Sequence, residues 1–575
     1  MKLRSDLPTR EPRQARSAAG RRLRWALPLL LAAAPLGFAA DAQPPIELPP
    51  MIVSDVTGAR PWHYASGPGI EVLARCDDDL AADFIRRNER LTQLLEYVLP
   101  ARFRFRTTAP RIAILVESAG SPSLSQGLVE QFGGTDRKPD AAPAGATAVR
   151  ILPNLELNDV DVDMVFGVID PRTFNADRLV FAPEHIRYAI ERRVPPLPAW
   201  FVEGLSRLLT QAEFTDDEVR FPEFPCASPE EAARLGADPD APRPIGSLVD
   251  LFGAPPADPA ALAHWQAEAE LFARWCLEPG APDRRPALWR FADAASRVGP
   301  SDALARECFQ LGYAGLRDRL SDYLPEAIDH RIVLRPPVTR VPDVAVSTAT
   351  YAQIGRIRGE WERLEIRFVQ TRHPEFAPQY IQMARDTLRR ARERVPTDTG
   401  VRVATALLDC DLGQRAAARP LLEAVFANPD ELVRPRAYVE LARMRLDDAL
   451  AVARVHGELS RAQAAVALQA LQRAISELPP LAEAYALTAE IWARSDAVLS
   501  DPQLALLSRA LEEYPTNIRL LYYTAVLQVN RKDYDRALDL VRRGVAAAQG
   551  TPAQAQFVAL RDALLKVRAS PPAGK

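Results

Sequence analysis

The chain has 575 residues, of which 47% are hydrophobic and 26% are charged, so it is too long for one core and too apolar for a wholly disordered protein. Lys and Arg total 72 against 75 Asp and Glu, a net charge of −3. Segment 1–42 carries eight basic and three acidic residues, and without it the totals are 64 and 72, a net charge of −8. This balance argues against a general nucleic-acid binder.

The N-terminus is typical of an export signal. Arginines precede an apolar run over residues 25–40, and Ala40 and Ala42 are the small residues that a signal peptidase needs before Gln43. A membrane anchor is the alternative, but sixteen residues interrupted by two prolines are short for a span. We therefore expect a signal peptide over 1–42, a proline-rich lead-in over 43–60, and a periplasmic or secreted protein.

The five cysteines show neither a CxxC pair nor the spacing of metal ligands. Their odd number leaves at least one thiol unpaired, although an exported compartment permits disulfides. Cys276 and Cys308 lie in apolar, helix-like contexts, which favours buried free thiols. We expect no cofactor.

Residues 61–335 predict an α+β domain, a small sheet followed by a helical half. Its expected elements, in chain order, are paired strands at 62–64 and 70–73 around a Gly-Pro-Gly turn, a helix over 77–98, a buried strand over 111–117, a loop over 119–148, strands at 148–152 and 162–169, and helices from about 177 to 324. Prolines then mark a linker over 336–350.

Everything after about Tyr351 predicts helices, and an internal repeat runs through them. Members of the repeat share a small residue, an aliphatic residue four positions later, a second small residue after three more, and then usually a proline. The matches are Ala384/Leu388/Ala391/Pro396, Ala417/Leu421/Ala424/Pro429, Ala467/Leu471/Ala474/Pro479 and, more loosely, Gln503/Leu507/Ala510/Pro515 and Ala537/Val541/Gly544. One longer step predicts an insertion within 445–462.

This pattern resembles the tetratricopeptide repeat (TPR), which has a period near 34 and small residues where the two helices of a pair touch. The alternative is an alanine-rich bundle with accidental spacing. The resemblance implies an all-α solenoid over 351–570 that binds a protein or peptide partner on the surface of its first helices. By repeat spacing, that surface would carry Arg519, Tyr522, Val526 and Asn530, and before them Glu483, Glu490 and Arg494.

A segment of the first domain resembles the gluzincin (MA-like) metallopeptidases. Pro183-Glu184-His185-Ile186-Arg187 stands where that family has HExxH, and the string WFVEGLS, which contains Glu203, stands where it has the helix of the third zinc ligand. Only Glu184 and Glu203 match the family. Pro183 offers no ligand and Arg187 is a permanent cation, so the resemblance implies a peptidase fold whose metal site is lost.

These residues also have purely structural interpretations. Pro183 with Glu184 is typical of a helix start, and Glu203 could form a surface helix pair with Arg207. His185 is expected to be a packed or surface residue. Three alternating aspartates, Asp159, Asp161 and Asp163, resemble a calcium loop but lack its glycine, so we expect solvated faces of a strand.

The sequence thus predicts an exported, non-catalytic scaffold protein without a bound metal, in which helical repeats bind a partner and a degenerate peptidase-like domain is retained. One alternative is an exported zinc metallopeptidase with an atypical metal site, held in part by Glu184 and Glu203. Another is a repeat array that serves only as a structural spacer or a self-association module. If the peptidase-like fold is correct, Arg187 should form an ion pair with Glu203 and replace the charge of the lost metal.

Overall fold

The computed structural model describes residues 60–105, 110–117, 123–132, 154–169, 183–214, 218–224, 245–337, 343–428, 433–453, 458–476, 480–496 and 498–569. The predicted signal peptide, nearly all of the lead-in, the strand expected at 148–152, and Cys226 lie outside these residues. From Pro61 onward the described chain belongs to a single compact unit.

A six-stranded sheet forms the N-terminal core, in the order β11-β1-β2-β4-β6-β5. β1 and β2 form the predicted antiparallel hairpin, in which Gly69 takes the left-handed conformation (φ 68°) that favours glycine. β2, β4 and β6 are parallel, and β5 runs antiparallel to β6. The bounds are β1 His63–Gly67, β2 Ile70–Arg75, β4 Arg111–Glu117, β5 Asn154–Asn158, β6 Asp163–Ile169 and β11 Val346–Thr348.

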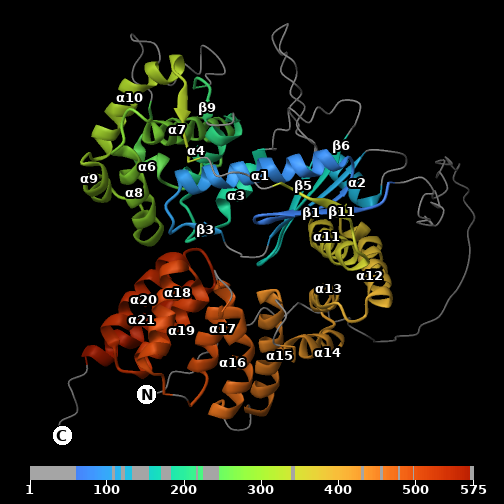
Figure 1. The fold of residues 1–575 in the computed structure, drawn as a ribbon. Coiled ribbons are helices and arrows are strands. Elements are labelled where there is room, and N and C mark those ends of the chain that lie inside the picture. Colours follow the sequence, from blue (N-terminus) through green and yellow to red (C-terminus); the bar gives the residue numbers. More distant parts are fainter. Residues whose placement is uncertain are drawn as a thin grey trace, which may run out of the picture. The chain divides into compact units, whose positions relative to one another are not determined.

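Helices cover both faces of this sheet. The predicted helix is present as α1 (Asp78–Val98), which connects β2 to β4 and buries one face (Figure 1). The other face packs against α2 (Leu124–Phe132) and α11 (Tyr351–Arg372), and Trp361 of α11 contacts Phe166 of β6. α12 (Ala377–Arg394) packs on α11 and belongs to the same hydrophobic core. The expectation of a continuous loop over 119–148 is therefore wrong, since it contains α2.

The segment predicted as a linker over 336–350 contains β11, which pairs with β1 at the edge of the sheet. The first helix after it, α11, begins at a Thr350–Gln353 capping box and packs directly on the sheet. The linker prediction missed this strand because Val346–Thr348 is too short to show an alternating pattern. Sheet and solenoid consequently share one hydrophobic core.

The predicted helical half of the first domain has its own aromatic core around Trp200, which contacts Phe252, Phe272 and Phe291. Cys276 and Cys308 are buried free thiols there, as predicted. The helices are α3 Pro183–Glu191, α4 Ala199–Thr210, α6 Leu248–Leu251, α7 Pro259–Leu277, α8 Arg284–Val298, α9 Asp302–Phe309 and α10 Tyr313–Asp329, with short strands β3 Arg104–Phe105, β7 Arg193–Val194, β8 Glu213–Phe214, β9 Val219–Phe221 and β10 Ile332–Leu334.

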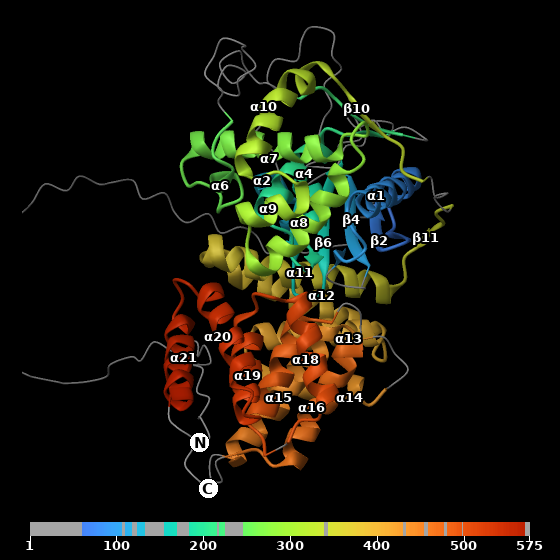
Figure 2. The same ribbon diagram turned by 90° about the vertical axis from the view of Figure 1, so that its left-hand side faces the viewer.

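The C-terminal part is a solenoid in which the described helices pair in succession (Figures 1 and 2). Each predicted repeat motif falls on the second helix of a pair, namely α12, α14, α16, α18 or α20. The helices after α12 are α13 Thr399–Asp411, α14 Arg415–Phe426, α15 Pro435–Ala453, α16 Arg461–Ser476, α17 Ala482–Ala493, α18 Asp501–Glu513, α19 Ile518–Asn530, α20 Tyr534–Ala547 and α21 Ala553–Ala569.

One repeat motif is one residue out of register. In α14 the buried residues are Ala418, Leu422 and Val425, whereas Ala417 and Ala424 are exposed. The insertion expected within 445–462 lies partly in α15, which has 19 residues where α13 has 13 and α17 has 12. None of the helices that the structure describes combines the length and apolar character of a membrane span.

Candidate functional site

The residues that replace the gluzincin motif lie on α3 and α4. Pro183 is the first residue of α3, as expected from a ring that suits a helix start. Arg187 donates from Nη1 to Glu203 Oε2 at 2.6 Å and from Nε to Glu191 Oε1 at 2.7 Å. The predicted Arg187–Glu203 ion pair is therefore confirmed. The structure describes the backbone of Glu184 and not its side chain.

The two partners of this pair differ in burial. The side chain of Glu203 is 6% exposed and that of Arg187 is 45% exposed. A buried carboxylate without a partner is costly, and the guanidinium of Arg187 is the partner that Glu203 has. Burial opposes the charge on Arg187, but its hydrogen bonds to Glu191 and Glu203 raise its pKa above the ordinary value.

The position of Glu203 is fixed by the close approach of α4 to α7. A Cβ built on Gly204 would lie 2.1 Å from the carbonyl oxygen of Ala269, so only glycine fits beside Glu203. The alternative surface pair of Glu203 with Arg207 is wrong, since Arg207 Nε donates to Glu270 Oε2 of α7 at 2.9 Å. Glu203 thus faces α3.

His185 is a packed residue, as expected, and its side chain is fully buried. Its Nε2 lies 2.9 Å from Arg111 Nη1 of β4, and its Nδ1 lies 3.0 Å from Glu156 Oε1 of β5. Burial, followed by the charge of Arg111, lowers the pKa of His185 to about 4. The neutral imidazole therefore ties α3 to the sheet. No group of three or more His, Cys, Asp or Glu side chains that could hold a metal is found in the described part of the chain.

Two of the three alternating aspartates belong to a second cluster, although the sequence pattern predicted solvated strand faces for all three. That expectation is wrong: Asp159 and Asp161 lie in the turn between β5 and β6 and are buried. Arg363 Nη2 donates to Asp159 Oδ2 at 2.7 Å. Asp161 accepts from Arg434 and, at 2.8 Å, from the backbone N–H of Arg436 near the start of α15. Asp161 therefore caps a helix 275 residues away in sequence.

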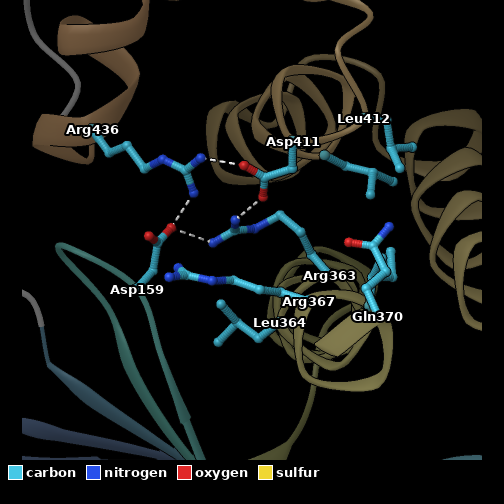
Figure 3. A pocket seen from close by; sticks show the side chains of 10 residues that line it. Asp159, Arg363, Leu364, Arg367, Gln370, Asp411, Leu412 and Arg436 are labelled. Carbon is cyan, nitrogen blue, oxygen red and sulfur yellow. Dashed lines mark hydrogen bonds and ion pairs between the residues drawn. The ribbon is translucent and has the colours of Figure 1, made fainter. Parts of the chain in front are cut away.

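Asp411, from the end of α13, closes this cluster into a ring. Arg363 and Arg436 each bridge Asp159 and Asp411, which defines the four-residue ring of Asp159, Arg363, Asp411 and Arg436 (Figure 3). Burial alone would raise the pKa of Asp159, but Arg363, Arg436 and Arg434 hold it well below its ordinary value. The ring fixes the sheet to the first three helix pairs.

The charged residues predicted for the solenoid surface lie together. Arg519 of α19 donates to Glu483 Oε1 at 3.0 Å and to Glu490 Oε2 at 2.5 Å, both on α17. Arg494 Nε lies 3.0 Å from Glu490 Oε1. Arg443 of α15, which was not among the residues predicted from the repeat spacing, forms an ion pair with Glu483. Ion pairs therefore link the first helices of three successive pairs.

The apolar part of the predicted surface is not open. Tyr522 and Val526 are 8% and 3% exposed, and the ring of Tyr522 lies 5.6 Å from that of Phe557 in α21. The prediction that they face a binding groove is wrong, because both are buried and α21, which follows the last repeat, packs Phe557 against Tyr522. Asn530, the last residue of α19, is exposed.

No family model matches the sequence, and no curated protein matches it. Among solved structures, a TPR protein of Thermus thermophilus is 19% identical over 36% of this chain and 99% of its own, with a TM-score of 0.24. Yeast Tom70 is 13% identical over 65% of this chain and 72% of its own, with a TM-score of 0.28. The repeat assignment rests on the helix pairs themselves.

Proposed function

We propose that this chain is an exported, non-catalytic scaffold protein whose helical repeats bind a protein or peptide partner and whose first domain is a degenerate peptidase-like module. The observation that carries the proposal is the Arg187–Glu203 ion pair. The resemblance places the second zinc ligand at position 187 and the third at Glu203. At position 187 the chain has a permanent cation, and this cation is bound to the carboxylate of Glu203.

The solenoid supports the binding role by its construction. Successive first helices are joined side by side through Arg443, Glu483, Arg519 and Glu490, so they form a continuous charged surface. Repeat arrays typically bind their partners along such a surface.

The experiment uses the full chain with a photo-crosslinking amino acid placed at one position at a time. Position 530, at the exposed end of α19, is the test site. Position 466, an exposed valine on the second helix α16, is the matched control. A partner crosslinked from position 530 and not from position 466 would support the proposal. Equal labelling from both positions would contradict it, and stoichiometric zinc with peptidase activity would favour the atypical metallopeptidase.

A further inference from the structure

The second helix of the first pair, α12, carries a local excess of positive charge. It contains five arginines against two acidic residues, a net charge of +3, whereas the chain without segment 1–42 has a net charge of −8. The apolar residues of α12 are buried in the core around α11, so the arginines lie on the outer side of this pair (Figures 1 and 2). All five are exposed, and they are Arg385, Arg389, Arg390, Arg392 and Arg394.

The charges of these arginines are not equally balanced. Arg389 forms ion pairs with both acidic residues of the helix. Arg385 and Arg392 form neither a hydrogen bond nor an ion pair with any residue in the described part of the chain. Because they are seven residues apart, both lie on the same face of α12. Burial raises the pKa of Asp409 on the neighbouring α13, and the charges of both arginines oppose that rise. Two cations beside one acidic side chain leave this face positive.

Exposed aromatic rings stand at both ends of α12. Phe376, which immediately precedes the helix, is 49% exposed, and Tyr351, at the start of α11, is 57% exposed. Cζ of Arg394, the last residue of α12, lies 4.5 Å from the centre of the Tyr351 ring. The arginines of α12 therefore extend between two accessible aromatic side chains.

We propose that this face of α12 binds the surface of a lipid bilayer that contains anionic phospholipids, with its arginines on the phosphates and Phe376 and Tyr351 among the headgroups. The inference goes beyond the proposed function, because it requires neither a peptide partner nor a peptidase-like module. An arginine near an anionic bilayer contributes about fivefold in affinity. A nucleic-acid duplex would use the arginines alone, whereas the interface of a bilayer also accommodates aromatic rings, and this favours the bilayer.

Cosedimentation of the full chain with vesicles tests the proposal. Vesicles of phosphatidylcholine that contain phosphatidylglycerol should bind the chain at low salt, and vesicles of phosphatidylcholine alone should not. The double variant Arg385→Gln/Arg392→Gln should bind the mixed vesicles about thirtyfold more weakly, from about fivefold for each arginine. The control Arg306→Gln/Arg317→Gln removes two exposed charges from α9 and α10, and it should weaken binding by less than about twofold.

Phe376→Ser tests the aromatic contact separately. It should weaken binding to the mixed vesicles by about fivefold at both low and high salt, because the burial of apolar surface is not screened. Thermal unfolding of each variant checks that the fold is retained, as expected for changes at exposed side chains.

Equal binding to the two kinds of vesicle, binding to neither, or equal losses in the two double variants would overturn the proposal. Parent-like binding of Phe376→Ser, together with retention of a DNA duplex by the parent protein and not by Arg385→Gln/Arg392→Gln, would overturn it in favour of a nucleic acid. None of these results affects the proposed function, because crosslinking from position 530 on α19 does not involve α12.

Discussion

Arg187 Nη1 lies 2.6 Å from Glu203 Oε2, so a permanent cation on α3 neutralises the one acidic side chain of α4. In the proposed peptidase-like module, Glu203 stands at the position of a zinc ligand, so its ion pair with Arg187 would take the place of the metal. Pro183, one turn before Arg187, supplies no donor to a metal.

Arg187→Ala should lower the free energy of unfolding by about 1–3 kcal/mol, because it leaves the buried carboxylate of Glu203 without its cation. The lower part of this range reflects the half-exposed guanidinium, which water already reaches. Glu191→Ala, which removes only the exposed partner of Arg187, is the control and should cost less than about 0.5 kcal/mol. Equal effects of the two variants in urea unfolding would contradict this assignment.

Gly204→Ala should destabilise the first domain by about 2 kcal/mol or more, since a Cβ there meets the backbone oxygen of Ala269 at 2.1 Å and forces α4 away from α7. The matched control is Gly127→Ala in α2, where a Cβ meets nothing within 4 Å. There the better helix propensity of alanine should stabilise by up to about 1 kcal/mol. Thermal unfolding of both variants gives the comparison, and a tolerated Gly204→Ala would disprove the close packing.

Glu365 should make stability depend on pH. Burial, with the nearby charge of Glu362, raises the pKa of Glu365 to about 8 in the folded protein, against 4.5 ordinarily. Between these pH values the folded state keeps a proton on Glu365 that the unfolded state has released. The stability that comes from this difference is complete below about pH 4.5 and is lost as the pH rises through 8.

The free energy of unfolding of Glu365→Gln, relative to that of the parent protein, should therefore rise by about 1.4 kcal/mol per pH unit over that range. Urea unfolding at pH 5.5 and pH 7.5 measures the gain. Glu393→Gln, at an exposed position of α12, should show no such trend. A constant difference between Glu365→Gln and the parent would show that Glu365 is ionised in the folded state.

Asp159→Asn should lower the free energy of unfolding by about 3 kcal/mol or more, because Arg363 would lose a buried carboxylate partner. The loss should change little with salt, since buried charges are weakly screened. Asp447→Asn, which breaks an exposed pair with Arg415, should change stability by less than about 0.5 kcal/mol. Chemical unfolding at low and high salt separates the two, and a small, salt-dependent effect of Asp159→Asn would contradict the buried ring.

The sequence was informative where both partners of a contact lie in one local pattern. Apolar runs located β4 and β6, alanine spacing located the second helices of the pairs, and the motif around Arg187 and Glu203 was enough to predict their contact. The register error at Ala417 arose because alanines also stand at the neighbouring position 418, so spacing alone did not choose between them.

Contacts between distant segments could not be predicted in this way. The partners of Asp159 lie 204 and 277 residues away. The sequences of their helices give no sign of a contact with the turn between β5 and β6. The burial of Glu360, Glu362 and Glu365 in α11 could not be predicted either, because the sheet and the helices that surround α11 come from other segments of the chain. Tyr522 likewise lies where the repeat spacing predicts an open surface, and Phe557 of α21 packs against it.

The most direct test of the central claim is the metal content of the purified full chain, measured by inductively coupled plasma mass spectrometry after dialysis against micromolar zinc. We predict far less than one zinc per chain, unchanged in Glu203→Gln, because Arg187 already holds the carboxylate. One zinc per chain that is lost in Glu203→Gln would contradict the account and identify a metal site at α3 and α4.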